Sequence, residues 1–223
     1  MIVSAYILED IHEIIDWIRS LENNFSLFRG QSNGKWKLQA SVGRYLIKYE
    51  LNDDIEKEIF LQFKKKSYHK LSRVPKTDFE WMMLCQHHRL PTRLLDWTTN
   101  PMIALYFAVC EHPDVDGSLF AIKSSSSLEP DSNSLPFEVE KVEIVFPHFV
   151  SDRQIAQSGC FTIHPKPKEV FNNNSVTKIK ISKDKKVEIA DTLKTLGYTK
   201  GVIFPDLDCL ANDIKVEFLN KGI

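Results

Sequence analysis

Seven polar side chains lie close together between two apolar stretches of the chain, at positions where packing alone does not require them. They are Gln86, His87, His88, Thr92, Arg93, Asp96 and Thr98. Charged, amide and hydroxyl groups at the edge of a core need partners, either one another or a ligand. Polar segments between rigid elements are also common places for binding sites. We therefore interpret residues 80–109 as the floor of a binding pocket.

Two helices are expected to hold this segment. Thr77 and Glu80 have the spacing of a capping box, which begins the first helix, and Pro101 fits the first position of the second helix. On the first helix His88 shares a face with the apolar residues, so we expect it to point into the core. His87, beside Gln86, is then the better candidate for ligand contact.

A short aromatic run, residues 25–28, predicts a strand that ends at Arg29 and Gly30. The planar fork of Arg29 suits a phosphate or carboxylate. An ion pair with Asp96 is the alternative, and one arginine can serve both roles. Gly30 permits a turn or a close approach of the backbone to a ligand.

Four blocks of the sequence resemble the FRG domain family, which is named for a Phe–Arg–Gly signature. They are FRGQS (28–32), QHHRLPTRLLDWTTNPMIALYFA (86–108), RQIAQSGCF (153–161) and GVIFPDLDCLA (201–211). The blocks come in the order of the family and cover most of the chain. The sequence departs from the family at Arg89, where glycine is usual. This departure indicates either an altered turn or an added basic group at the rim of the pocket.

The same blocks are similar in outline to ADP-ribosyltransferases of the arginine–serine–glutamate kind, a likeness at the level of the fold. Arg29 stands for the arginine of the early strand, and residues 96–99 stand for the polar Ser/Thr motif before a helix. Gln157 lies near the position of the catalytic acid but carries no charge. The carboxylate must then come from elsewhere, and Asp96 is the first choice. Three glutamates are the second choice, although an exposed alternating strand explains them more simply; they are Glu138, Glu140 and Glu143.

This likeness implies NAD as the substrate. Cleavage of the nicotinamide–ribose bond builds positive charge on the ribose, so a nearby carboxylate gives the strongest aid. The pyrophosphate suits arginines, and the nicotinamide suits an aromatic face. The expected catalytic residues are Asp96, Gln157 and Arg29. The expected binding residues are Arg29, Gly30, Gln31, Gln86, His87, Thr92, Arg93, Trp97, Thr98, Tyr106, Arg153 and Phe161.

Two functions stay open at this point. The first is an NAD-using, ADP-ribosyltransferase-like enzyme that transfers to nucleic acid or protein, or cleaves NAD, as a bacterial or phage toxin or defence effector. The second is a non-catalytic module that binds a nucleotide or nucleic acid in the same pocket, which the missing glutamate favours. The sequence has no Walker A or G-x-G-x-x-G loop, no G-x-S-x-G elbow and no H-E-x-x-H motif.

Helices and short strands alternate irregularly along the chain, which predicts an α+β fold. We expect one domain over residues 1–223, with short mixed or antiparallel strands surrounded by helices. The likeness to ADP-ribosyltransferases implies a split sheet. Residues 202–204 are expected to form a strand, and residues 124–136, rich in Ser, Asn and Pro, a flexible loop.

Composition places the chain among ordinary globular proteins, with a net charge of −1 that gives no global attraction to nucleic acid or a membrane. The lysine clusters at 64–66 and 183–186 are expected to be solvated surface. Four widely spaced cysteines indicate reduced core thiols of a cytoplasmic protein. Cys85 and His88 form a lone C-x2-H, so no metal is expected. No stretch is apolar enough for a membrane span.

Overall fold

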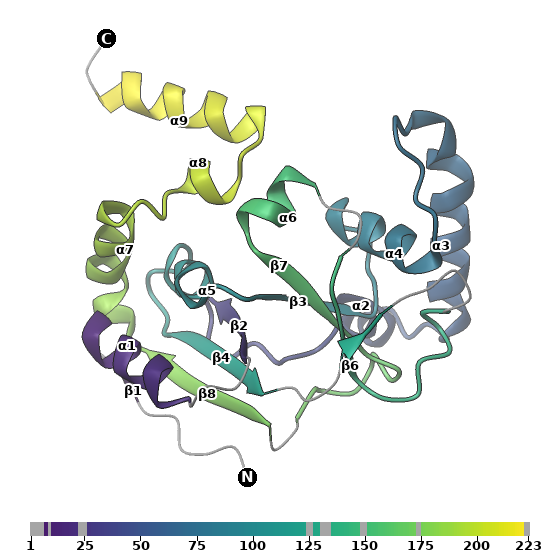
Figure 1. The fold of residues 1–223 in the computed structure, drawn as a ribbon, viewed down its shortest axis with the longest axis horizontal. Helices are drawn as coiled ribbons and strands as arrows, with labels where there is room; N and C mark the ends of the chain where they lie inside the picture. Colours follow the sequence, from purple (N-terminus) through teal and green to yellow (C-terminus); the bar gives the residue numbers. More distant parts are fainter. Residues whose placement is uncertain are drawn as a thin grey trace.

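The computed structural model describes residues 7–8, 10–21, 26–123, 127–129, 135–147, 151–172 and 175–220. The fold is α+β, as the sequence predicted (Figure 1). Its strands are β1 (Ile7–Leu8), β2 (Ser26–Gln31), β3 (Leu94–Thr98), β4 (Gly117–Lys123), β5 (Ser127–Leu128), β6 (Glu143–Val145), β7 (Gly159–Ile163) and β8 (Val176–Ile181). Its helices are α1 (Ile11–Ser20), α2 (Ser41–Lys48), α3 (Asp54–Ser67), α4 (Asp78–His87), α5 (Pro101–Val109), α6 (Asp152–Ala156), α7 (Lys186–Thr195), α8 (Lys200–Ile203) and α9 (Leu207–Asn220). Two short 3₁₀ helices, η1 (Tyr68–Lys70) and η2 (Lys183–Lys185), follow α3 and precede α7.

The described strands form one sheet in the order β1-β8-β4-β2-β3-β7-β6-β5. Most neighbours are antiparallel, while β1 is parallel to β8 and β5 is parallel to β6. At the centre, β2 and β3 share a single residue pair, Phe28 with Thr98. The strands on either side of this point pair over five or six residues. We call this weak join the seam, and it divides the sheet into two halves (Figure 1).

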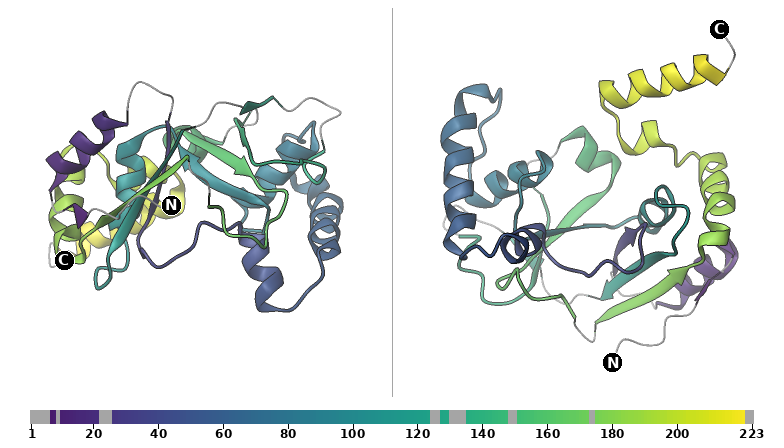
Figure 2. Two further views of the ribbon diagram at one scale, coloured as in Figure 1. Left: turned by 90° about the horizontal axis from the view of Figure 1, so that it is seen from below. Right: turned by 180° about the vertical axis from the view of Figure 1, so that it is seen from behind.

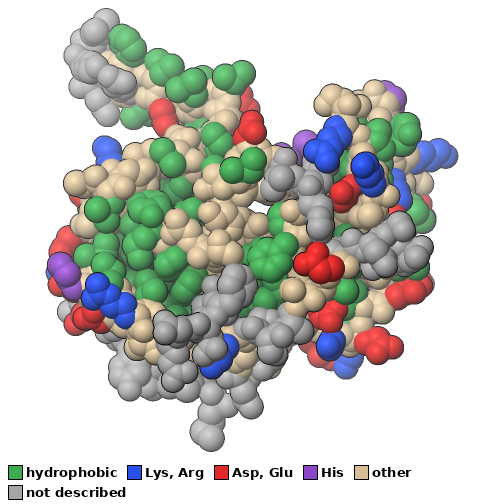
Figure 3. Space-filling view, viewed as in Figure 1, with side chains coloured by type: hydrophobic (Ala, Val, Ile, Leu, Met, Phe, Trp, Pro, Cys, Tyr) green, Lys and Arg blue, Asp and Glu red, His purple; other side chains and the backbone are tan. Residues whose placement is uncertain are grey.

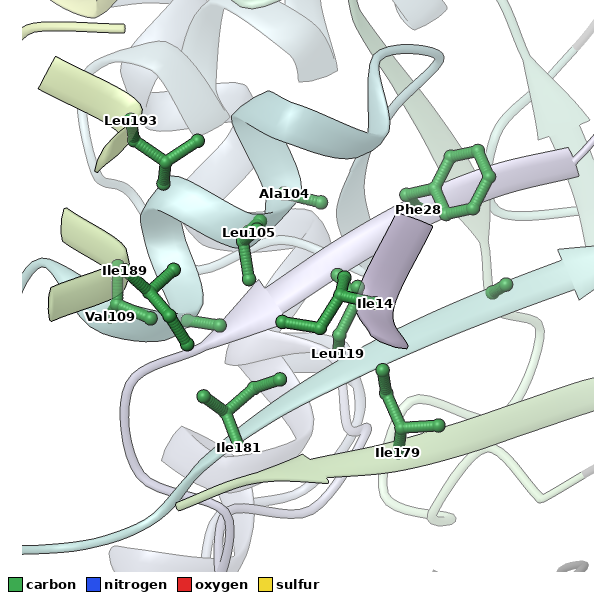
Figure 4. Packing of buried hydrophobic residues seen from close by; sticks show 12 residues of the cluster. Ile14, Phe28, Ala104, Leu105, Val109, Leu119, Ile179, Ile181, Ile189 and Leu193 are labelled. Atoms are coloured by element: carbon green, nitrogen blue, oxygen red, sulfur yellow. The ribbon is translucent and has the colours of Figure 1, made fainter. Parts of the chain in front are cut away.

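The half-sheet that contains β2, β4 and β8 is covered by α1, α5 and α7. Its core joins Ile14 of α1, Leu105 of α5 and Leu193 of α7 to Leu119 of β4 (Figure 4). Helix α5 lies so close to β2 that a Cβ at Gly30 would lie 1.8 Å from the carbonyl oxygen of Ala104. Gly30 therefore permits close approach, as expected, but the partner is a helix of the protein.

The half-sheet that contains β3, β7 and β6 is covered by α3 and α4. Phe60 and Trp81 from these helices pack with Leu94 and Ile163. On the opposite face a third cluster is shared by both halves, since Leu27 of β2 and Leu95 of β3 both belong to it. The two halves thus have separate cores on one face and a common core on the other.

Local capping sets where several helices begin. Asp10 accepts a hydrogen bond from the backbone of His12, Thr77 from Glu80, and Asn100 from Met102. Helix α6 has a full capping box, because Ser151 and Gln154 each bond to the other's backbone. Such caps satisfy amide groups that a helix end leaves unpaired, and those at Thr77 and Asn100 confirm the predicted starts of α4 and α5.

Two details differ from the sequence-based expectations. Residues 202–204 do not form a strand: residues 200–203 are helical, because Thr199 caps the amide of Val202. Helix α4 ends at His87, so His88 is exposed instead of pointing into the core. Asp96 and Thr98 lie in strand β3. The expected loop at 124–136 lies largely outside the described residues.

The lysine and cysteine expectations held only in part. Lys186 is 1 % exposed, and its ammonium donates to the carbonyl oxygens of Ser32, Glu111 and His112 at 2.7–2.9 Å. It is therefore a structural tie and not solvated surface. Three thiols are buried and none is in a disulfide, but Cys110 is exposed.

Helix α9 extends away from the rest of the molecule and packs against α8 (Figures 1 and 2). It carries exposed apolar side chains, among them Leu207, Leu210 and Ile214. Of the helices that the structure describes, none combines the length and apolar character required to cross a lipid bilayer.

Candidate functional site

A cavity of about 300 Å³ opens beside the seam, on the side of the sheet covered by α4 and α5. Strand β2 contributes Phe28, Arg29 and Gly30, and β3 contributes Asp96, Trp97 and Thr98. The other lining residues come from the end of α4 and its following turn, from α5, from α6 and its end, and from β7. They are Met83, Gln86, His87, Arg89, Ala104, Phe107, Arg153, Gln154, Gln157 and Phe161.

Arg29 crosses the seam. Side chains alternate along a strand, so Arg29 leaves β2 on the face of Leu27, away from α5. Its Nη1 nevertheless donates to the backbone oxygen of Asp96 on β3 at 2.5 Å. The side chain is 20 % exposed, and its Nε is buried without a hydrogen-bond partner among the described residues. Burial, and the nearby Arg44, lower the pKa of Arg29, while Asp96 opposes that shift.

Asp96 is held from two sides. Its Oδ2 lies 3.7 Å from Nη1 of Arg29 and accepts a hydrogen bond from Nε2 of Gln86 at 3.0 Å. Gln86 is oriented in turn by Thr92, whose hydroxyl donates to Oε1 of Gln86 at 2.6 Å. The Asp96 side chain remains 57 % exposed. A charged carboxylate is thus positioned by a hydrogen-bond network and is open to the cavity.

The opposite wall is formed by α6 and is held by side chains that donate to backbone oxygens. The hydroxyl of Thr98 donates to the backbone carbonyl oxygen of Gln157 at 2.7 Å, and the side-chain Nε2 of Gln157 donates to the backbone carbonyl oxygen of Ile203 in α8 at 3.2 Å. Arg153 stacks on the ring of Phe204, 4.6 Å from its centroid. These contacts fix α6 between β3 and α8.

The cavity is basic and partly aromatic. Arg29, Arg89 and Arg153 contribute three guanidinium groups, and Asp96 is the one carboxylate among the lining residues. Burial, with smaller effects of His88 and Arg153, lowers the pKa of His87, which favours its neutral form. The arrangement suits an anionic ligand that also carries a ring.

Comparison with family models gives a match to part of the chain. Residues 24–117 match the model of the FRG domain. The chain contains an FRG domain. The searches of curated proteins and of solved structures found no match.

The matched part of the FRG domain runs from β2 to the first residue of β4. It includes Arg29 and Asp96, and therefore both sides of the seam. The cavity is completed by α6 and β7, which follow later in the chain. Residues within the family match and residues that follow it build one site.

Four of the expected binding residues do not line the cavity. Arg93 forms a buried, bidentate ion pair with Glu56, with nitrogen–oxygen distances of 3.0 and 2.6 Å. Thr92 acts through Gln86, and Gln31 is buried, with its Oε1 unpartnered among the described atoms. Tyr106 packs against Phe107, and burial raises its pKa to about 12.

Trp97 contributes to the cavity wall, but its ring does not offer a stacking face. It is 3 % exposed, and its Nε1 donates to Thr162 at 2.9 Å. Phe161 is buried to the same degree, so Phe107, which is half-buried, is the aromatic residue better placed for a ring. Helical spacing could have indicated two lining residues that were not predicted: Met83 lies one turn before Gln86, and Gln154 lies one turn before Gln157.

The backbone conformation at Arg89 explains why glycine is usual at this position in the family. It has a φ of 63°, in the left-handed region that favours glycine. The amide of Arg89 bonds to Gln86 and that of Leu90 to Cys85, which is the Schellman pattern at the end of α4. The turn is preserved, and a basic group is added at the cavity. Within the described part of the chain, no cluster of three or more His, Cys, Asp or Glu residues could hold a metal ion.

Proposed function

We propose that this FRG-domain protein uses NAD as a substrate in the manner of an ADP-ribosyltransferase. The observation that carries the proposal is that Arg29, Asp96 and Gln157, from three distant segments, line one cavity with Arg89 and Arg153. A pyrophosphate dianion matches the guanidinium groups in charge and in donor geometry. The two-part sheet with its single-pair seam supports the likeness to a split sheet.

Asp96 is assigned the role of the carboxylate. Positive charge develops on the ribose as the bond to nicotinamide breaks, and a preorganised anion in a partly closed site stabilises that charge. Gln86 and Arg29 fix the position of Asp96, so little reorganisation is needed. Gln157, whose amide nitrogen already donates to Ile203, orients a ribose hydroxyl or the acceptor through its oxygen.

The acceptor is a nucleic acid or a protein, or water when NAD is only cleaved. An activity of this kind fits a toxin or defence effector of bacterial or phage origin. Four cysteines without a disulfide fit a cytoplasmic site of action.

One observation favours a second function, a nucleotide-binding module without turnover. Asp96 is the sole carboxylate among the cavity-lining residues of the described chain, and Gln86 and Arg29 already engage it. A carboxylate engaged by both side chains can serve to position Arg29 for binding alone.

Incubation with NAD separates the two functions. We expect nicotinamide release, measured by chromatography, and its loss in Asp96→Asn with NAD binding retained, because asparagine keeps an oxygen for Gln86 but removes the charge. Asp114→Asn, at an exposed position outside the cavity lining, is the matched control. Binding without release would establish the second function. The absence of both binding and release would refute both.

A further inference from the structure

One segment of the surface is strongly basic although the chain as a whole is not. Residues 59–77 hold six lysines and arginines and no aspartate or glutamate, in a chain of net charge −1. The six are Lys64, Lys65, Lys66, Lys70, Arg73 and Lys76. All except Lys64 are exposed, and Lys64 pairs with Asp78 at 2.5 Å. Figure 3 shows blue side chains gathered at the upper right, where Figure 1 places the end of α3.

This basic segment borders an apolar groove of about 450 Å³ along α3. Ile59, Phe63 and Leu90 line the groove, and Lys66 and Lys70 flank it. Gln62 and Ser67 complete the rim together with Glu58. Glu58 lies two helical turns before Lys66, about 12 Å away along the axis, and accepts a hydrogen bond from Gln62. The groove therefore has one basic end.

The groove adjoins the cavity of the FRG domain. Leu90 lines the groove, while its neighbour Arg89 lines the cavity. His88, which precedes Arg89, packs toward α3, with its ring centroid 6.2 Å from that of Phe63. A chain-like ligand that followed the groove would pass the end of α4 and reach the cavity.

We propose that the groove and the basic segment bind single-stranded nucleic acid and lead it to the cavity. The phosphates match the lysines in charge, and such contacts dominate nucleic-acid affinity. The apolar floor suits unpaired bases, which stack on apolar and aromatic side chains. A duplex keeps its bases away from such a floor.

An aromatic platform lies within the same segment. Tyr68 is 61 % exposed and stacks on Trp81, with ring centroids 6.5 Å apart and an interplanar angle of 21°. The ring face of Tyr68 that points away from Trp81 can take a base.

The role of the bound nucleic acid as the acceptor of ADP-ribose rests on the proposed function, whereas the binding of the nucleic acid does not.

Fluorescence anisotropy with labelled 12-nucleotide strands of mixed sequence, one of DNA and one of RNA, tests the binding without NAD. We expect K66E/K70E to weaken binding about tenfold or more and to reduce its dependence on salt, since fewer counterions are released. Tyr68→Ala should weaken binding about fivefold or more through lost stacking. The DNA and RNA arms show which sugar is preferred.

K183E/K185E reverses the same number of charges in the other lysine cluster and is the matched control. It should change the affinity less than about twofold. Equal losses in both double variants would overturn the proposal, as would no binding by the wild type. Stronger binding to duplex or to vesicles of anionic lipid would also overturn it. The anisotropy assay contains no NAD, so it does not depend on the proposed enzymatic activity. If the protein releases no nicotinamide from NAD, the proposed activity is refuted and the result on nucleic-acid binding still stands.

Discussion

Replacement of Arg93 by methionine should destabilise the fold without removing a ligand contact. Arg93 and Glu56 are 7 % and 3 % exposed and form two hydrogen bonds, and the guanidinium also lies 4.8 Å from the ring centroid of Phe137. Removal of one partner leaves the other as a buried, unpaired charge. Such a change typically costs about 3–5 kcal/mol, a large part of the total stability of about 5–15 kcal/mol of an ordinary domain.

The double variant Glu56→Met/Arg93→Met separates the charge effect from the loss of packing. Two apolar side chains of similar length leave no buried charge, so the double variant should recover most of the lost free energy of unfolding. Urea unfolding followed by circular dichroism measures all three proteins. Asp16→Asn, which breaks the exposed pair with Arg19, is the control and should change little.

Two results would refute this reasoning. One is a loss below about 1 kcal/mol for Arg93→Met, which would mean that the ion pair contributes as little as a surface pair. The other is a double variant as unstable as the single variant, which would assign the loss to packing around Phe137 and not to the unpaired carboxylate.

Three further predictions concern the backbone and one buried histidine. Gly30→Ala should cost about 2 kcal/mol or more, because a Cβ collides with Ala104, whereas Gly159→Ala, whose Cβ would have 3.5 Å of clearance, should be nearly neutral in urea unfolding. Arg89→Gly should raise stability by about 1 kcal/mol by relieving the positive φ, and Arg89→Ala should not; equal effects would contradict the strain argument. Burial, aided by Arg29, lowers the pKa of His164 to about 4 from its ordinary 6.5, so the unfolded chain takes up the proton first. Stability should be complete above pH 6.5 and fall by up to about 3 kcal/mol as the pH approaches 4, and the difference in unfolding free energy from His164→Gln should vary over that range; a constant difference would refute a neutral histidine.

Features with local causes were predictable from the sequence. Thr77 caps α4 through the amide of Glu80, three residues away, so spacing alone located this helix start. The cap at Thr199 was equally local, but the β-branched residues that follow it favoured the wrong prediction of a strand. In this segment the capping residue predicts the helix correctly, whereas the strand propensity of the residues after it does not.

The candidate site was predictable only in outline. The sequence blocks indicated Arg29 and Asp96, which do line one cavity, but not that Arg29 reaches it across the seam. Arg93 was misjudged because its partner, Glu56, is 37 residues distant, and pairing at that range has no periodic signal. Whether an arginine serves a ligand or the core depends on such distant neighbours.

The single residue pair between β2 and β3 also affects the mechanics of the protein. One ladder pair offers little backbone resistance to opening, so thermal motion should break the pairing of β2 with β3 before it disturbs the cores that belong to each half alone. Arg29 lies in β2 and Asp96 in β3, on opposite sides of the seam. A small molecule that binds both residues would link the two halves, so the sheet should become more rigid when the ligand binds and less rigid when it is released. Occupancy should therefore register as slower hydrogen exchange along β2 and β3.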